Sequence, residues 1–262
     1  MLTFAIVGGG PTGVEFSGAL AELIRGPLSK DYSVLDFREV RCLLLEASDH
    51  LLPGLPGQLQ VYAMNRLQKM GVEVHLGAMV TQITPESVIL KDGTFIHLET
   101  VVWTAGVHGA PPAQAVGVPI LHNGQVNILP TLQVPGHPEV YVIGDLAKLE
   151  DNGRSIPMVA PVAVQEDDMA AQNIMWQISG QEPMPFHYQD PGTLVTIGRN
   201  AAAVHLGGRN FTGFLAWLLW LSVHLYKLIG FRNRLLVLIN RAWDYIFFER
   251  GVRLIVLLPE QR

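Results

Sequence analysis

A glycine-rich turn near the start of the chain constrains the fold more than any other feature. The run GGGPTG contains Gly8, Gly10 and Gly13 at the spacing G-x-G-x-x-G. The apolar residues 3–8 lead into it as an expected buried strand, and a helix is expected to begin near Thr12. In such a unit the first glycine permits the tight turn, the second lets a pyrophosphate approach the backbone, and the third lets helix and strand pack closely. Phosphates then lie at the positive end of the helix, so the motif predicts dinucleotide binding.

An acidic residue at the end of a second strand supports this interpretation. The run VRCLLLE at 40–46 predicts a strand that ends on Glu46. A carboxylate there can accept hydrogen bonds from both hydroxyls of an adenosine ribose and would repel a 2′-phosphate, and residues 47–50 offer no arginine for one. NADH is therefore predicted over NADPH. Glu46 lies 38 residues after Gly8, against about 20 in the usual unit, and the connector 26–39 can absorb the excess.

The remaining pattern completes one α/β domain and starts a second region. Lys91-Asp92-Gly93 is typical of a hairpin turn, and the Pro- and Gly-rich stretch 107–139 favours loops. Helices are expected at 12–25, 58–70 and 160–178, and strands near 72–76, 78–83, 87–90, 94–98, 99–103, 140–143, 193–197 and 201–206.

Composition excludes several classes. With 49% hydrophobic and only 16% charged residues the chain is not of the disordered type. The single Cys42 excludes a disulfide scaffold, a cysteine zinc site or a redox pair within this chain. The nine histidines show no metal-ligand spacing, so no metal site is predicted. A net charge of −5 argues against a nucleic-acid partner.

The C-terminal region has a composition of its own. Residues 199–262 contain nine of the 18 Lys/Arg but three of the 23 acids, a net charge of +6, while residues 1–198 carry −11. Apolar helices are expected at 214–229 and 234–248, with Trp and Tyr residues suited to a headgroup layer. A buried helical hairpin and a bilayer span are alternatives. The closely spaced arginines favour a hairpin that lies in the interface of an anionic membrane.

Four segments together resemble a known family. They are GGGPTGVE, the strand ending LLLEAS, VVWTAG at 101–106 and VYVIGDLA at 140–147. In order and spacing they resemble type II NADH dehydrogenases, which are single-subunit, non-proton-pumping NADH:quinone oxidoreductases, and the tail is similar to bacterial members. The resemblance implies an α/β flavoprotein with two dinucleotide-binding domains, which uses FAD and NADH, reduces a membrane quinone and attaches to the cytoplasmic face of a bacterial inner membrane.

The same resemblance implies roles for individual residues. Asp145 would bond the ribityl chain of FAD, with Gly144 allowing close approach. The segment of Thr104, Ala105 and Gly106 would cross between domains near the flavin. Each of these also has a plain interpretation as a turn former at a strand end.

A further motif would lie on the quinone side. The run APVAVQE at 160–166 matches it, with Pro161 where many members have glutamine, and places Ala163 beside the cofactor. Gln165 would bond a quinone carbonyl, unless it is an ordinary amide near a helix start. Glu15 would lie near the nicotinamide and flavin rings and carry a proton to the quinone, unless it is simply favoured by the helix dipole.

The expected domains are a complete NADH domain at 1–106, the C-terminal half of a FAD domain at 107–198, and a membrane-associating region at 199–262. The resemblance implies that an N-terminal FAD-binding half with its own glycine motif is missing, so the chain is expected to be a fragment that holds FAD poorly. Two rivals remain: another pyridine-nucleotide flavoprotein reductase, and a non-catalytic, NADH-binding, membrane-tethered remnant. The quinone type and the oligomeric state, a homodimer included, stay open.

Overall fold

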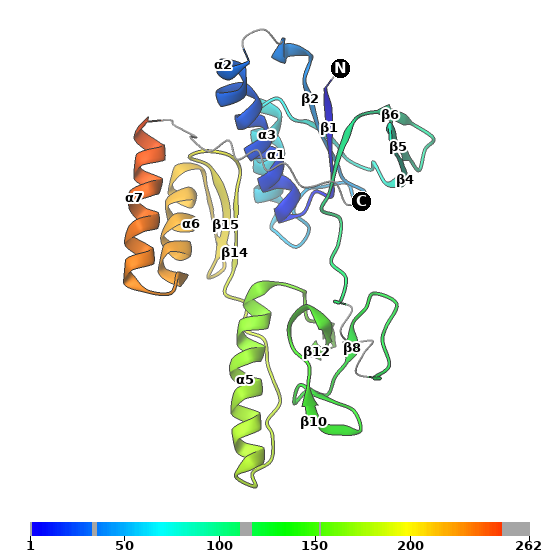
Figure 1. Cartoon of the computed structure of the whole chain (residues 1–262), viewed down its shortest axis with the longest axis vertical. Coiled ribbons are helices and arrows are strands. Elements are labelled where there is room, and N and C mark those ends of the chain that lie inside the picture. Colours follow the sequence, from blue (N-terminus) through cyan, green and yellow to red (C-terminus); the bar gives the residue numbers. More distant parts are fainter. Residues whose placement is uncertain (1, 33–35, 111–116, 152, 248–262) are drawn as a thin grey trace, which may run out of the picture. The chain divides into compact units, whose positions relative to one another are not determined.

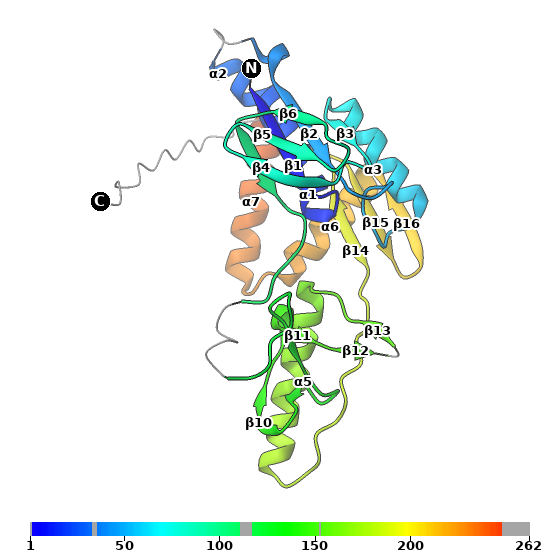
Figure 2. The same ribbon diagram turned by 90° about the vertical axis from the view of Figure 1, so that its right-hand side faces the viewer.

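The computed structural model describes residues 2–32, 36–110, 117–151 and 153–247 (Figures 1 and 2). The chain divides into two compact units. Unit 1 combines residues 1–105 with residues 193–262, and unit 2 comprises residues 106–192.

A four-stranded parallel sheet forms the centre of unit 1. Its order is β3 (Glu73–His75), β2 (Arg41–Leu45), β1 (Thr3–Val7) and β7 (Thr100–Trp103). All three pairings are parallel, with Thr3 opposite Arg41 and Phe4 opposite Thr100. The short apolar runs of β1 and β2 are almost entirely buried, as expected of strands covered on both faces.

The two faces of this sheet bury alternate residues of the same strands. Ile6 and Leu44 pack in a core with the helices α1 (Pro11–Leu23) and α3 (Gly57–Lys69). Ala5 and Leu43 pack on the other face, in a core with a small antiparallel sheet. That sheet is β4 (Val80–Thr84), β5 (Ser87–Leu90) and β6 (Phe95–His97), with the turn at 91–93 as predicted.

The connector between α1 and β2 is partly helical. Directly after α1 the chain forms a π-helical segment at Ile24–Leu28, with Pro27 inside it, and then a short α2 at Ser29–Asp31. A 3-10 turn at Phe37–Glu39 precedes β2. The expected helix at 12–25 therefore ends two residues earlier as a regular α-helix.

Unit 1 is completed by the C-terminal part of the chain. It contains the antiparallel strands β14 (Thr193–Thr196), β15 (Ala202–Leu206) and β16 (Arg209–Thr212), followed by α6 (Gly213–Lys227) and α7 (Phe231–Phe247). Val195, Ile197 and Ala203 are buried in the same core as Ile6. The structural division therefore differs from the expected boundary at 198, because these strands fill the core beside α1. No helix within the described part of the chain is both long and apolar enough to cross a bilayer.

Unit 2 packs several short strands against one long helix. The helix α5 spans Ala160–Ile178, the range that the sequence predicted. A 3-10 turn at Gly144–Leu146 follows the strand that ends at Tyr141. The strands are β8 (Val126–Asn127), β9 (Gln133–Val134), β10 (His137–Tyr141), β11 (Ala147–Lys148), β12 (Glu150–Asp151) and β13 (Arg154–Ser155).

Candidate functional site

The glycine turn joins β1 to α1 in unit 1, as the sequence predicted. Gly8 has φ +109°, a conformation that favours glycine. A Cβ at Gly8 would come within 2.8 Å of Ala105 N, and one at Gly13 would lie 1.8 Å from Gly8 O. A Cβ at Gly10 would have no heavy atom within 4 Å. Gly8 and Gly13 are therefore fixed by packing inside the unit, whereas the space over Gly10 is open to a ligand.

The start of α1 presents backbone donors without a capping side chain. The N-cap is Gly10, which has no side chain to cap the helix, and Pro11 follows as the first helical residue. Because proline has no N–H, the amides of Thr12 and Gly13 are the first available donors of this helix. Thr12 is exposed, and the first turn contains no acid. The positive helix end can therefore receive an anionic group.

Glu46 lies next to this turn and is tied to it. The Gly9 amide donates to Glu46 Oε2 at 2.5 Å, and the amide and hydroxyl of Ser48 donate to Oε1 at 2.8 and 2.9 Å. Burial alone would raise the pKa of Glu46, but the hydrogen bonds from Ser48, Gly9 and Ala47 outweigh it and lower the pKa. An ionised acceptor is thus fixed at the end of β2.

The segment after β7 closes the other side of the turn. Thr104 Oγ1 donates to Val7 O at 2.8 Å and to Gly8 O at 3.1 Å. Trp103 Nε1 donates to Ala105 O at 3.1 Å. Gly106 has φ +109° and is exposed. The structure thus brings Thr104 and Ala105 against the glycine turn.

Glu15, on α1, is bonded to β14. Its Oε1 accepts the amide of Thr196 at 3.0 Å and the hydroxyl at 3.2 Å. One turn further along α1, a Cβ at Gly18 would lie 2.8 Å from Gly198 N, and Glu22 accepts the amide of Arg199. Glu15 therefore has a structural partner inside unit 1, in addition to the role that the resemblance implies.

The other predicted residues lie in unit 2, around the start of α5. Gly144 has φ +68°, and a Cβ there would lie 3.4 Å from Ala163 Cβ. The Asp145 side chain beside it is exposed. Gln165 donates to Gln189 O at 2.9 Å and accepts from Gln189 N at 3.0 Å, so both ends of its amide hold the extended chain before β14.

Four residues of these sites were given no role from the sequence. Gly9 and Ser48 are the donors to Glu46, and a Cβ at Gly9 would lie 2.6 Å from Leu51 Cδ2. Glu166 and Gln125 hold the Gly144–Leu146 turn. No local sequence pattern indicates either pair.

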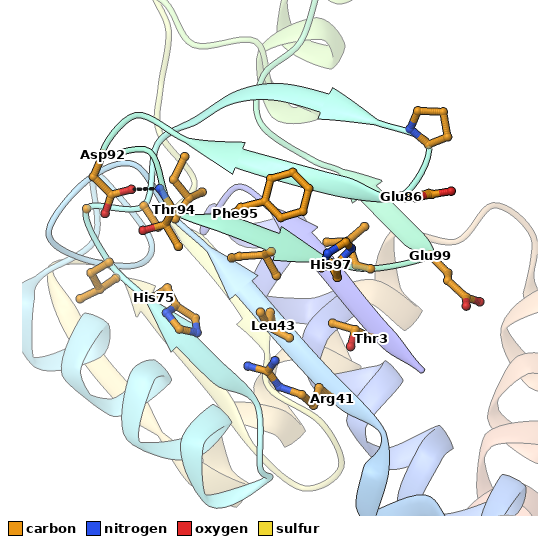
Figure 3. Close-up of a pocket in the computed structure, with 17 residues that line it drawn as sticks. Thr3, Arg41, Leu43, His75, Glu86, Asp92, Thr94, Phe95, His97 and Glu99 are labelled. Atoms are coloured by element: carbon orange, nitrogen blue, oxygen red, sulfur yellow. Dashed lines mark hydrogen bonds between the residues drawn. The ribbon is translucent and has the colours of Figure 1, made fainter. Parts of the chain in front are cut away.

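A cavity of about 830 Å³ lies elsewhere in unit 1, between the parallel sheet and the edge strand β6 (Figure 3). Two of its charged lining residues, Arg41 and Asp92, are bonded within the protein. Arg41 forms a two-point bond to Glu73 at 2.8 and 2.5 Å, and Asp92 accepts the Thr94 amide at 2.8 Å. The glycine turn does not line it. The glycine turn predicted to bind a dinucleotide thus lies outside this cavity.

Comparisons with known proteins identify the families that the chain resembles. Residues 2–166 match the pyridine nucleotide-disulphide oxidoreductase family, and residues 191–250 match the NDH2 C-terminal domain. A type II NADH:quinone oxidoreductase of Mycobacterium tuberculosis, Ndh, is 38% identical over 96% of this chain and 56% of the relative. A second one, NdhA, is 36% identical over 100% of this chain and 60% of the relative. The chain thus spans a little more than half the length of these curated relatives.

The chain also resembles solved structures in its fold. The NDH2 structure from Plasmodium falciparum in complex with NADH matches with a TM-score of 0.85 and 16% identity, over 97% of this chain and 67% of that one. At this identity the likeness concerns the fold alone, and it shows a Rossmann-like α/β flavoprotein fold.

Proposed function

The chain belongs to the pyridine nucleotide-disulphide oxidoreductase family, within it to the type II NADH dehydrogenases, and we propose that it serves to pass electrons from NADH through FAD to a membrane quinone. One observation carries the nucleotide part: Glu46 is fixed by the Gly9 amide beside an uncapped helix start. The donors at the helix start suit a pyrophosphate, and the carboxylate suits a ribose with free hydroxyls.

The test of this part is a titration of the 262-residue chain with each nucleotide. We expect NADH to bind more tightly than NADPH, because Glu46 repels a 2′-phosphate. Equal dissociation constants for the two nucleotides would contradict the proposal.

The flavin part rests on the Gly144–Asp145 turn and Ala163 in unit 2. The left-handed Gly144 lets the backbone approach a ligand closely, and the exposed Asp145 carboxylate can accept hydrogen bonds from ribityl hydroxyls. These residues fit one wall of a flavin site. Bound FAD would accept a hydride from NADH and release the electrons to a quinone. We propose that residues beyond these 262 complete the site, since the curated relatives are longer.

Complementation tests the flavin part. The chain alone should bind NADH and purify without flavin colour. Fusion to the N-terminal portion of a curated relative should restore bound flavin and NADH:quinone turnover. A fused protein that folds and binds NADH but takes up no FAD would contradict this part of the proposal.

On the quinone side, we propose that Glu15 holds a proton for quinone reduction and that Gln165 borders the quinone. Only Oε1 of Glu15 accepts bonds from Thr196, and its side chain is partly exposed, so the second oxygen can take a proton. In the fused protein Glu15→Gln should slow quinone reduction more than flavin reduction by NADH, measured by stopped flow.

A matched control separates this role from a structural one. Glu22→Gln alters the next tether between α1 and the loop after β14, since Glu22 accepts the Arg199 amide. If the two variants slow quinone reduction equally, Glu15 acts only as a tether.

The α6–α7 hairpin is proposed to attach the protein to an anionic bilayer surface, the cytoplasmic face of a bacterial inner membrane. Large apolar side chains are exposed on it, among them Leu215 at 67% and Ile229 at 88%. Cations stand beside its amphipathic aromatics: Arg241 lies 5.5 Å from the Trp220 ring centre and Arg234 5.4 Å from that of Tyr226. This mixture suits a helix pair lying in the headgroup layer.

Sedimentation with vesicles tests the attachment. The chain should sediment with phosphatidylglycerol-containing vesicles and less so with purely zwitterionic ones. Each cation near the surface contributes about 1 kcal/mol, so Lys227→Glu with Arg232→Glu should weaken binding by at least about 30-fold. Lys91→Glu, at the distant β5–β6 turn, should change it little. A chain that stays in the supernatant would contradict the proposal.

A further inference from the structure

The turn that presents Asp145 is held by a buried carboxyl group. Glu166 on α5 is only 1% exposed, and its Oε2 accepts the amide of Gly144 at 2.5 Å. It lies in the buried row of the helix with Val162, Ala170 and Asn173. Gly144 is left-handed and is the first residue of the 3-10 turn, so its amide would be a partly buried donor without an acceptor if Glu166 were absent.

A second buried side chain holds the other end of the same turn. Gln125 is 3% exposed, and its Nε2 donates to Asp145 O at 3.3 Å and to Ala147 O at 2.8 Å. The Gln125 side-chain oxygen in turn accepts Asn123 Nδ2 at 2.8 Å. The turn is therefore bonded through its first amide on one side, and on the other through the carbonyl of Asp145 and that of Ala147, the residue after the turn.

This arrangement leaves the Asp145 side chain exposed to solvent. Both supports bond the backbone of the turn, and the Asp145 side chain is exposed. Glu166 also interacts with Asp145 as a like charge, which opposes any inward turn of the Asp145 carboxylate. A buried carboxyl is costly in a helix that could have an apolar residue at that position. A buried acid bonded to this turn departs from an apolar core, and such departures are expected at functional sites.

We propose that Glu166 is a positioning residue for flavin binding, which fixes the Gly144–Leu146 turn so that Asp145 meets the ribityl hydroxyls without reorganisation, with Gln125 as its counterpart. This inference rests on the proposed flavin function. Preorganisation raises affinity because the turn is already ordered before FAD binds.

Two measurements test it on three variants. Hydrogen exchange of the 262-residue chain follows the amides of residues 142–148, and FAD titration of the fused protein follows affinity. Glu166→Ala should speed exchange in that segment and weaken FAD binding about tenfold or more, as expected for one lost buried hydrogen bond. Glu166→Gln keeps an acceptor and should restore slow exchange and FAD affinity to within about threefold. Asp145→Ala should weaken FAD binding with exchange unchanged.

The outcomes separate the two proposals. If the wild-type fused protein does not bind FAD, the proposed flavin function is refuted, and this inference with it. If it binds FAD, Asp145→Ala weakens binding and Glu166→Ala does not, only the positioning role is refuted. Gln125→Met removes the donor at the other end with little change of shape, so it gives the same test if Glu166→Ala fails to fold. NADH affinity of the chain, which depends on unit 1, should be unchanged in every variant.

Discussion

Replacing Glu46 by alanine should reduce the preference for NADH over NADPH. Three hydrogen bonds end on this carboxylate, at 2.5 Å from the Gly9 amide and at 2.8 and 2.9 Å from Ser48. Ser48 can turn to water, but Gly9 is buried and its N–H is left without an acceptor. The cost to stability is therefore that of one unsatisfied buried donor, about 1–3 kcal/mol. Because Glu46 is partly exposed, the lower half of that range applies.

The nucleotide loses the ribose contacts and meets a displaced Gly9 amide next to the pyrophosphate position. We expect NADH affinity to fall by about 1–3 kcal/mol, or about 5- to 150-fold. NADPH affinity should stay constant or rise, since the repulsion of its 2′-phosphate is removed.

Fluorescence titration of both nucleotides measures this change, with Asp49→Ala as the matched control. Asp49 carries the same charge three residues away, is exposed and pairs with His50, without touching the glycine turn. The control should leave both affinities within about twofold, as expected for an exposed ion pair. An unchanged ratio of affinities in Glu46→Ala would refute the assigned geometry.

Further predictions concern the glycine turn, the buried carboxyl group of Glu166 and the side-chain amide of Gln165. Gly10→Ala should leave the melting temperature unchanged but weaken NADH binding, because its Cβ points into open space. Gly13→Ala should destabilise the chain, because its Cβ would lie 1.8 Å from Gly8 O. Burial, and secondarily the charge of Asp145, raise the pKa of Glu166 above its ordinary value of 4.5, although the Gly144 bond opposes this. The folded state therefore binds the proton more tightly, so its stability should fall as pH rises from about 4.5 through the raised pKa, and Glu166→Gln should flatten that slope in melting curves. Gln165→Ala removes both bonds to Gln189 and should cost about 1 kcal/mol in urea unfolding, with faster exchange in residues 187–190.

The parts of the fold that sequence predicted well are those with local signals. The apolar run before Gly8, the glycine spacing and the expected helix at 160–178 each occupy consecutive residues, and β1, the turn and α5 lie where they were expected. The two-residue strands between 126 and 155 are too short to show a period, and none of them was predicted. Of the five-residue β10, only the end was predicted. The place of β14 and β15 in unit 1 depends on contacts of Val195 and Ala203 with residues far away in sequence.

The site residues, too, could be predicted from the sequence only in part. Glu46 could be predicted because a strand end fixes its position relative to the glycine turn. Its donors Gly9 and Ser48 could not, because they depend on side-chain torsions and on the path of the loop after β2. Glu166 follows a polar residue near the start of a helix and resembles a surface acid in sequence, and only the packing of α5 on the Gly144 turn buries it.

Hydrogen exchange of the 262-residue chain with and without NADH locates the bound nucleotide without requiring FAD, quinone or turnover. We expect slower exchange on NADH addition at residues 8–14 and 46–48, where the first amides of α1 and the hydrogen bonds of Glu46 lie. Segments lining the cavity of Figure 3, such as residues 94–99, should be unaffected. Protection confined to that cavity, or none at the glycine turn at saturating NADH, would contradict the proposed nucleotide site.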